Sequence, residues 1–212
     1  MYSNAPLELN ESVINTLDSV LINLSASAFE GDVSHYELYF IRGTFYEKLL
    51  RLFGRKNMAF SKKEKHIYAA HPDFRKGILK RNNNEFEWLN LVQIISHEAV
   101  HSQMYKDHSR LGFMLTPSWI NEGYCEYISY QPIRAQPEYQ LSKVLNRFHQ
   151  SNDQWLKTEY QSMTPRVYVR DRLLVEFLID VKGKTIEAII EDELLDPDAI
   201  YAELLIHFEL AG

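Results

Sequence analysis

The stretch of sequence that decides the fold is residues 84–107, NEFEWLNLVQIISHEAVHSQMYKD. Its apolar residues recur every three or four positions, which predicts a half-buried helix over about 85–107. Asn84 is expected to cap this helix, with Glu87 reaching back to it as in a capping box, and Gly112 lies beyond the expected end. The predicted buried face contains Trp88, Leu91, Val92, Ile95 and Ala99.

Two histidines lie one helical turn apart in this stretch, as His97-Glu98-Ala99-Val100-His101. Side chains at positions i and i+4 project from the same face of a helix. Two imidazoles placed in this way can bind one Zn²⁺ ion, which accepts nitrogen ligands at about 2.0–2.1 Å. Glu98 lies one step around the helix, where it can accept a proton from a zinc-bound water without being a ligand itself. The five residues therefore predict a zinc-binding helix.

A catalytic zinc site needs a third protein ligand and an open position for water. Glu122 is the candidate, because the 20 residues between it and His101 suffice for a helix end, a loop and the start of an antiparallel helix. Glu126 lies one turn after Glu122 and is expected to accept the N–H group of a histidine ligand, His97, and so orient it. The alternative interpretation of these two residues is an exposed glutamate pair on an amphipathic helix.

The sequence around this glutamate, Trp119-Ile120-Asn121-Glu122-Gly123-Tyr124, resembles the tryptophan–x–asparagine–glutamate–glycine–aromatic signature of gluzincin metallopeptidases, such as aminopeptidase N-like enzymes. Thermolysin-like enzymes share the pattern of two histidines and a downstream glutamate. The resemblance covers about residues 85–185, roughly half of the chain. The chain has no match to the glycine-rich motif that captures a free substrate amine in the exopeptidases, and it is shorter than those enzymes. The resemblance implies a zinc peptidase with His97, His101 and Glu122 as ligands, Glu98 as general base and Glu126 as the supporting carboxylate.

Amide hydrolysis also generates an oxyanion, which a hydrogen-bond donor beside the metal stabilises. Gluzincins use a tyrosine or a histidine of the helical half for this purpose. Tyr168 is the first candidate, because the segment that it begins resembles the tyrosine-led helix of related bacterial peptidases. Tyr160 and His149 are the alternatives, and a tyrosine that only packs is the other interpretation of Tyr168.

Two other residues near the motif are given simpler interpretations. A metzincin site would need glycine at position 104 and a third ligand at 107, but the chain has Met104 and Asp107, so His108 is not expected to belong to a metal site. Cys125 is the only cysteine, which excludes an internal disulfide and a multi-cysteine metal site. We interpret it as a small buried residue.

The predicted fold class is α+β, with two subdomains that together form one catalytic domain. Residues 1–110 are expected to contain a small mixed sheet and the histidine-bearing helix. Residues 111–212 are expected to be mostly helical, and a zincin-like arrangement of two lobes around a cleft follows from the resemblance. Predicted strands cover about 35–42, 58–61, 66–70 and 77–80. Predicted helices cover about 8–24, 44–53, 116–130 (with Thr116 as cap and Pro117 at its first position), 137–150, 166–182, 185–195 and 198–210.

Composition excludes several other classes. The net charge is −6 with dispersed acidic residues, and the longest basic cluster, Lys62-Lys63-Glu64-Lys65, is short and interrupted, so no nucleic-acid partner is expected. No run of about 18 apolar residues exists, so no membrane span is expected. The N-terminus lacks a charged segment followed by an apolar one, which argues against a secretory signal. The missing signal and the single cysteine favour a reducing compartment, and therefore a cytoplasmic location.

The prediction is therefore a zinc-dependent metallopeptidase that acts on a peptide or protein substrate. A strand near residues 66–81 is expected at the sheet edge facing the cleft, where extended substrate can pair with it. The alternative is a catalytically silent zincin-like protein that binds a peptide or a partner in the same cleft. A third possibility is a structural pair of helices without metal.

Overall fold

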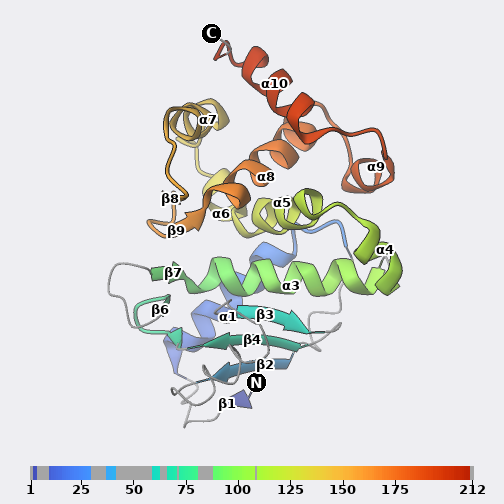
Figure 1. Ribbon diagram of the computed structural model, residues 1–212. Helices are drawn as coiled ribbons and strands as arrows, with labels where there is room; N and C mark the ends of the chain where they lie inside the picture. Colours follow the sequence, from blue (N-terminus) through green and yellow to red (C-terminus); the bar gives the residue numbers. More distant parts are fainter. Residues whose placement is uncertain are drawn as a thin grey trace.

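The computed structural model describes residues 2–3, 10–29, 37–41, 59–62, 66–70, 72–80, 88–107 and 109–210. These residues form an α+β fold, which confirms the predicted class. Figure 1 shows a small sheet on one side of the long helix α3 (Leu91–Asp107) and a helical half on its other side. Helix α3 therefore lies between the two halves, with α5 (Ser118–Ser129) and α8 (Arg166–Glu176) stacked above it in that view.

The sheet below α3 has four strands in the order β1-β2-β4-β3. Strands β1 (Tyr2–Ser3), β2 (Glu37–Ile41) and β4 (His66–Ala70) run parallel, whereas β3 (Ala59–Lys62) is antiparallel to β4. The sheet is therefore mixed, as predicted. Ile67 and Ala69 are both buried, as expected for alternate residues that share one face of a strand. The helix predicted at 44–53 lies outside the described residues.

The edge of this sheet that lies against α3 is β3, and the strands at 66–70 and 78–80 are central strands and not the expected edge, so only the two-residue strand at 72–73 lies at a sheet edge within 66–81. Strand β4 is paired on both sides, because the antiparallel β3 covers its second edge. Strand β6 (Ile78–Lys80) is likewise the central strand of a second sheet, between β5 (Pro72–Asp73) and β7 (Trp88–Asn90).

Helix α3 begins six residues later than predicted, because the expected first two turns include strand β7. Residues 88–90 pair with β6, and the backbone N–H of Leu91 donates to the carbonyl oxygen of Gly77 at 2.9 Å. The side chain of Asn90 then accepts a hydrogen bond from the backbone N–H of Gln93 at 2.9 Å, which is the capping interaction expected at a helix start. The predicted capping pair Asn84 and Glu87 lies outside the described residues.

Helix α1 (Glu11–Leu24) packs against α3 from the side of the sheet and is capped by Asn10. The N–H of Val13 donates to the Asn10 side chain at 3.2 Å, so the helix begins at residue 11 and not at 8 as predicted. Its last turn is tied to the centre of the fold by Asn23, whose side-chain amide donates to the hydroxyl of Ser96 on α3 at 3.0 Å.

The helical half contains the predicted helices with shifted ends. The region before α5 differs most, because α4 (Ser109–Leu115) includes Gly112, and the Thr116 hydroxyl donates to the carbonyl oxygen of Gly112 at 3.0 Å instead of capping α5. A hairpin of β8 (Trp155–Lys157) and β9 (Met163–Pro165) precedes α8 and was not predicted. The remaining elements are α6 (Gln131–Arg134), α7 (Leu141–Gln150), α9 (Ile186–Glu191) and α10 (Pro197–His207).

Helix α8 continues into a π-helical turn, Phe177–Val181, and the helical path ends near Gly183 as predicted. Gly183 has φ +68°, and the N–H of Lys184 donates to the carbonyl oxygen of Leu178 at 3.0 Å. A left-handed glycine with such a bond is a common way to close a helix.

Helices α5 and α8 pack so closely that Gly123 has no room for a side chain. A Cβ atom at this position would lie 2.5 Å from the backbone oxygen of Asp171 and 2.8 Å from Cγ2 of Val175. The buried apolar residues of the sheet, α3, α5 and α8 form one continuous cluster, so the two halves share a core. None of the described helices has the length and apolar character needed to cross a membrane.

Candidate metal centre

Helices α3 and α5 bring three potential metal ligands to one point. His97 and His101 lie one turn apart on α3, and their Nε2 atoms are 3.1 Å apart. Glu122 faces them from α5, with its Oε2 atom 3.2 Å from Nε2 of His97 and 3.5 Å from Nε2 of His101. His97 is buried, whereas His101 and Glu122 are half-buried. The three atoms therefore form a small triangle between α3 and α5.

This triangle matches the spacing of three ligands around a tetrahedral metal ion. Ligand atoms at about 2.05 Å from a tetrahedral zinc ion are about 3.3–3.4 Å from one another. The three observed distances of 3.1, 3.2 and 3.5 Å fall on both sides of that value. Oε2 of Glu122 is buried and forms no hydrogen bond of acceptable geometry in the described part of the chain, although two imidazole nitrogens face it. A cation between the three atoms would give each of them a partner.

The charges around His97 also favour a cation at this point. Burial lowers the pKa of His97, but the nearby carboxylates of Glu122 and Glu126 outweigh burial and raise that pKa well above its ordinary value. For Glu122, burial raises the pKa, whereas the nearby imidazoles of His101 and His97 lower it far below its ordinary value. Glu122 therefore stays ionised, and the imidazole beside it takes up a proton when no other cation is bound. A proton and a metal ion compete for the same position.

Glu126 lies behind His97, one turn after Glu122 on α5. Oε1 of Glu126 is 3.0 Å from Nδ1 of His97, within hydrogen-bond distance, and the glutamate side chain is only 3% exposed. Its other oxygen, Oε2, accepts a hydrogen bond from Nε2 of Gln93 at 3.0 Å. The sequence pointed to Glu126 as the partner of His97, and the fold brings the two together. A carboxylate in this position fixes the orientation of a histidine ligand.

Tyr168 comes to the same point from the first turn of α8. Its ring stacks on the ring of His97, with centroids 5.9 Å apart and an interplanar angle of 25°. Burial, and then the carboxylates of Glu122, Glu126 and Glu98, raise the pKa of Tyr168, so its hydroxyl keeps its proton. Within the described residues this hydroxyl forms no hydrogen bond, so it is available as a donor.

The two alternatives to Tyr168 lie elsewhere. The hydroxyl of Tyr160 donates to the backbone oxygen of Ser129 at 2.9 Å, so it is engaged behind α5. Nδ1 of His149 is 3.1 Å from the hydroxyl of Tyr201, in an exposed position on α7. Neither residue has a described contact with the histidine pair. Tyr168 is thus the member of the three that the fold brings to the histidines. His108 lies outside the described residues.

The sequence did not identify Cys125 as a potential ligand. Cys125 is fully buried on α5, and its sulfur and one nitrogen from each of His97 and His101 lie within 4.8 Å of one another, so these three residues could hold a metal ion. Burial, and then the nearby carboxylates led by Glu122, raise the pKa of the Cys125 thiol well above its ordinary value. Glu122 has the tetrahedral spacing to both histidines, and Cys125 is the other candidate for the third ligand.

The residues around Glu122 fix the start of α5, and therefore the position of Glu122 opposite the two histidines. The side-chain amide of Asn121 donates to the backbone oxygens of Phe113 and Thr116, both at 3.3 Å, which fixes the turn that leads into α5. Phe113 in turn packs edge-on to His101, with ring centroids 6.0 Å apart. Gly123 allows α8, and therefore Tyr168, to approach. Asn121 thus fixes the turn, Glu122 faces the two histidines, and Gly123 lets the neighbouring helix approach.

No protein-family model matches the chain, and neither a curated protein nor a solved structure does.

Proposed function

We propose that this chain is a zinc-dependent metallopeptidase of the gluzincin type. The observation that carries the proposal is the triangle of His97 Nε2, His101 Nε2 and Glu122 Oε2, whose sides of 3.1, 3.2 and 3.5 Å fit a tetrahedral zinc ion. Three protein ligands leave one position open, which is the arrangement of catalytic rather than structural zinc sites. We infer that zinc is bound there by the two histidines and the glutamate.

Zinc in such a site supplies a Lewis acid that polarises a carbonyl group and lowers the pKa of water to about 7. The residues of the chain supply the remaining functions. The carboxylate of Glu98 accepts a proton from the attacking water and later delivers it to the nitrogen of the leaving amine. The hydroxyl of Tyr168 donates a hydrogen bond to the carbonyl oxygen as negative charge develops on it. Its raised pKa keeps that donor protonated.

The substrate that we propose is an extended peptide or protein segment. Strand β3 lies against α3, and its second edge pairs with no other described strand. An exposed strand edge offers backbone N–H and C=O groups with which an extended peptide can pair. The only cysteine, Cys125, is a free thiol in the interior, which suits a reducing compartment such as the cytoplasm.

The decisive variant is Glu98→Gln, which keeps the shape of the side chain and removes its ability to accept a proton. We expect this variant to bind zinc with the stoichiometry of the parent protein and to lose hydrolysis of a quenched fluorescent peptide library. Glu191→Gln, at an exposed position of α9, is the matched control and should retain activity. Full activity of Glu98→Gln would remove Glu98 from this role. A parent protein that binds zinc but hydrolyses no peptide would instead support the catalytically silent alternative.

A further inference from the structure

Gln93 is a buried polar residue that the proposed zinc site does not by itself require. It lies on α3 one turn before His97, and it is 2% exposed. A buried amide is unfavourable unless both its donor and its acceptor groups have partners. Gln93 has a partner on each side, because its Nε2 donates to Oε2 of Glu126 at 3.0 Å and its Oε1 accepts from the hydroxyl of Ser162 at 3.2 Å.

The contacts fix the direction of both hydrogen bonds of Gln93. Its NH₂ group donates to a carboxylate oxygen of Glu126, and its side-chain oxygen faces the hydroxyl of Ser162. The Ser162 hydroxyl must then donate to Gln93. Its oxygen is left to accept, and the hydroxyl of Thr158 lies 3.1 Å from it. The donors of Ser162 and Gln93 therefore both point toward the carboxylate beside His97, whereas the hydroxyl of Thr158 also donates to the backbone oxygen of Ser162 at 3.2 Å.

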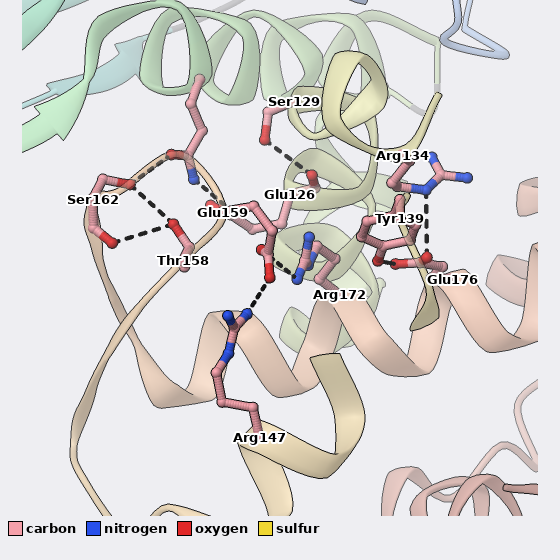
Figure 2. A network of polar contacts seen from close by, with 11 residues as sticks. Glu126, Ser129, Arg134, Tyr139, Arg147, Thr158, Glu159, Ser162, Arg172 and Glu176 are labelled. Carbon is pink, nitrogen blue, oxygen red and sulfur yellow. Dashed lines mark hydrogen bonds and ion pairs between the residues drawn. The ribbon is translucent and has the colours of Figure 1, made fainter. Parts of the chain in front are cut away.

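Ser162 is held in place by the hairpin β8–β9, which is itself fixed to the core. Thr158 and Ser162 face each other across its turn, as Figure 2 shows, and the hydroxyl of Tyr160 donates to the backbone oxygen of Ser129 on α5 at 2.9 Å. Oε2 of Glu159, from the same turn, lies 3.5 Å from Nη2 of Arg172, which is 1% exposed on α8. The hairpin is thus attached to α5, which carries Glu122, and to α8, which carries Tyr168.

We propose that Gln93 and Ser162 are positioning residues of the metal centre. They hold the carboxylate of Glu126 in the plane and direction in which it orients His97, so the hairpin β8–β9 stabilises the zinc site without touching the ion. This inference rests on the proposed zinc site. It adds two residues, one of them 65 positions after His97 in the sequence, on which metal affinity depends.

The test compares two glutamines on the same helix. Gln93 and Gln103 both lie on α3 and are both 2% exposed, but Gln103 has no described contact with Glu126. Methionine is close to glutamine in size and cannot donate to a carboxylate. We expect Gln93→Met to raise the zinc dissociation constant by about 10–100-fold, the usual effect of losing a residue that supports a metal ligand. Gln103→Met should leave the constant near that of the parent. The constant is measured by competition with a chromophoric chelator.

Urea unfolding of the metal-free proteins separates positioning from general destabilisation, because a purely structural role would lower stability without changing the zinc affinity of the folded protein. Ser162→Ala is the second variant, and it should weaken zinc binding in the same direction but less. It decides the matter if Gln93→Met does not fold. The visible spectrum of the cobalt-loaded proteins should change for Gln93→Met and stay unchanged for Gln103→Met.

The outcomes distinguish the inference from the proposed function. Loss of affinity in Gln93→Met and Ser162→Ala, but not in Gln103→Met, supports the inference. If the parent protein binds zinc and Gln93→Met binds it as tightly, the inference is overturned and the proposed zinc site stands. Ser162→Ala decides in the same way if Gln93→Met does not fold. Equal loss in both glutamine variants also overturns it, since the effect is then a general one of the core. A parent protein that binds no zinc overturns both.

Discussion

Replacing Gly123 by alanine tests whether the close approach of α5 and α8 is needed. The added Cβ would lie 2.5 Å from the oxygen and 2.8 Å from the carbon of the Asp171 backbone carbonyl group, and ordinary contact begins near 3.4 Å. The helices must therefore separate by up to about 0.9 Å, because a backbone group, unlike a side chain, cannot rotate away. Overpacking of this kind costs about 1–3 kcal/mol. Alanine recovers up to about 1 kcal/mol through its higher helix propensity.

Because two of the three short contacts involve backbone, we expect the upper half of the range and a net loss of about 1–2 kcal/mol in the free energy of unfolding. Urea denaturation of the metal-free protein measures it. The same separation moves Tyr168 away from His97, so kcat should fall while zinc remains bound. Ser118→Ala, at an exposed position of the same helix, should change stability by less than about 0.5 kcal/mol. A Gly123→Ala protein as stable and as active as the parent would refute the reasoning.

Three further predictions concern the site. Tyr168→Phe should keep its zinc and lose about 10²–10³-fold in kcat, the usual effect of removing an oxyanion donor, and an unchanged kcat would exclude that role. Cys125→Ser should bind zinc with unchanged stoichiometry, whereas Glu122→Gln should bind it much more weakly; the reverse result in metal analysis would make the thiol the ligand. Asp171 is 4% exposed, and burial, followed by Glu122 against the opposing effect of Arg170, raises its pKa to about 7. Folding therefore favours the neutral carboxyl group of Asp171. The stability that this group contributes is lost as pH rises from its unfolded pKa of 3.8 through its folded pKa of about 7. In metal-free protein, Asp171→Asn should therefore raise the free energy of unfolding by an amount that grows over that pH interval, as measured by urea denaturation at a series of pH values. A difference between variant and parent that does not change with pH would contradict the shifted pKa.

The histidine pair and the class of the fold could be predicted because they depend on local patterns. His97 and His101 needed only a helix to face the same way, and the apolar spacing of residues 91–107 specified that helix. The start of α3 could not be predicted in the same way. Residues 88–90 satisfy a helical pattern, but they pair with β6, and only the tertiary structure decides between these two uses of the backbone.

The hairpin β8–β9 gave no signal because its turn lacks the usual residues. Hairpin turns are commonly marked by glycine or asparagine in the left-handed region, but here Gln161 takes that conformation with φ +58°. Gln93 was missed for a related reason. Its partner Ser162 lies 69 positions away on that hairpin, so a polar residue on an apolar helix face had no visible partner in the sequence. Cys125 likewise could be predicted to be buried, but its distance from the histidines depends on how α5 crosses α3.

The most direct test of the central claim is X-ray absorption spectroscopy at the zinc edge on protein loaded with one equivalent of zinc. A site made of His97, His101 and Glu122 predicts only nitrogen and oxygen neighbours at about 2.0–2.2 Å, with the outer-shell pattern of two imidazole rings. A sulfur neighbour at about 2.3 Å, or a zinc ion without imidazole neighbours, would contradict it.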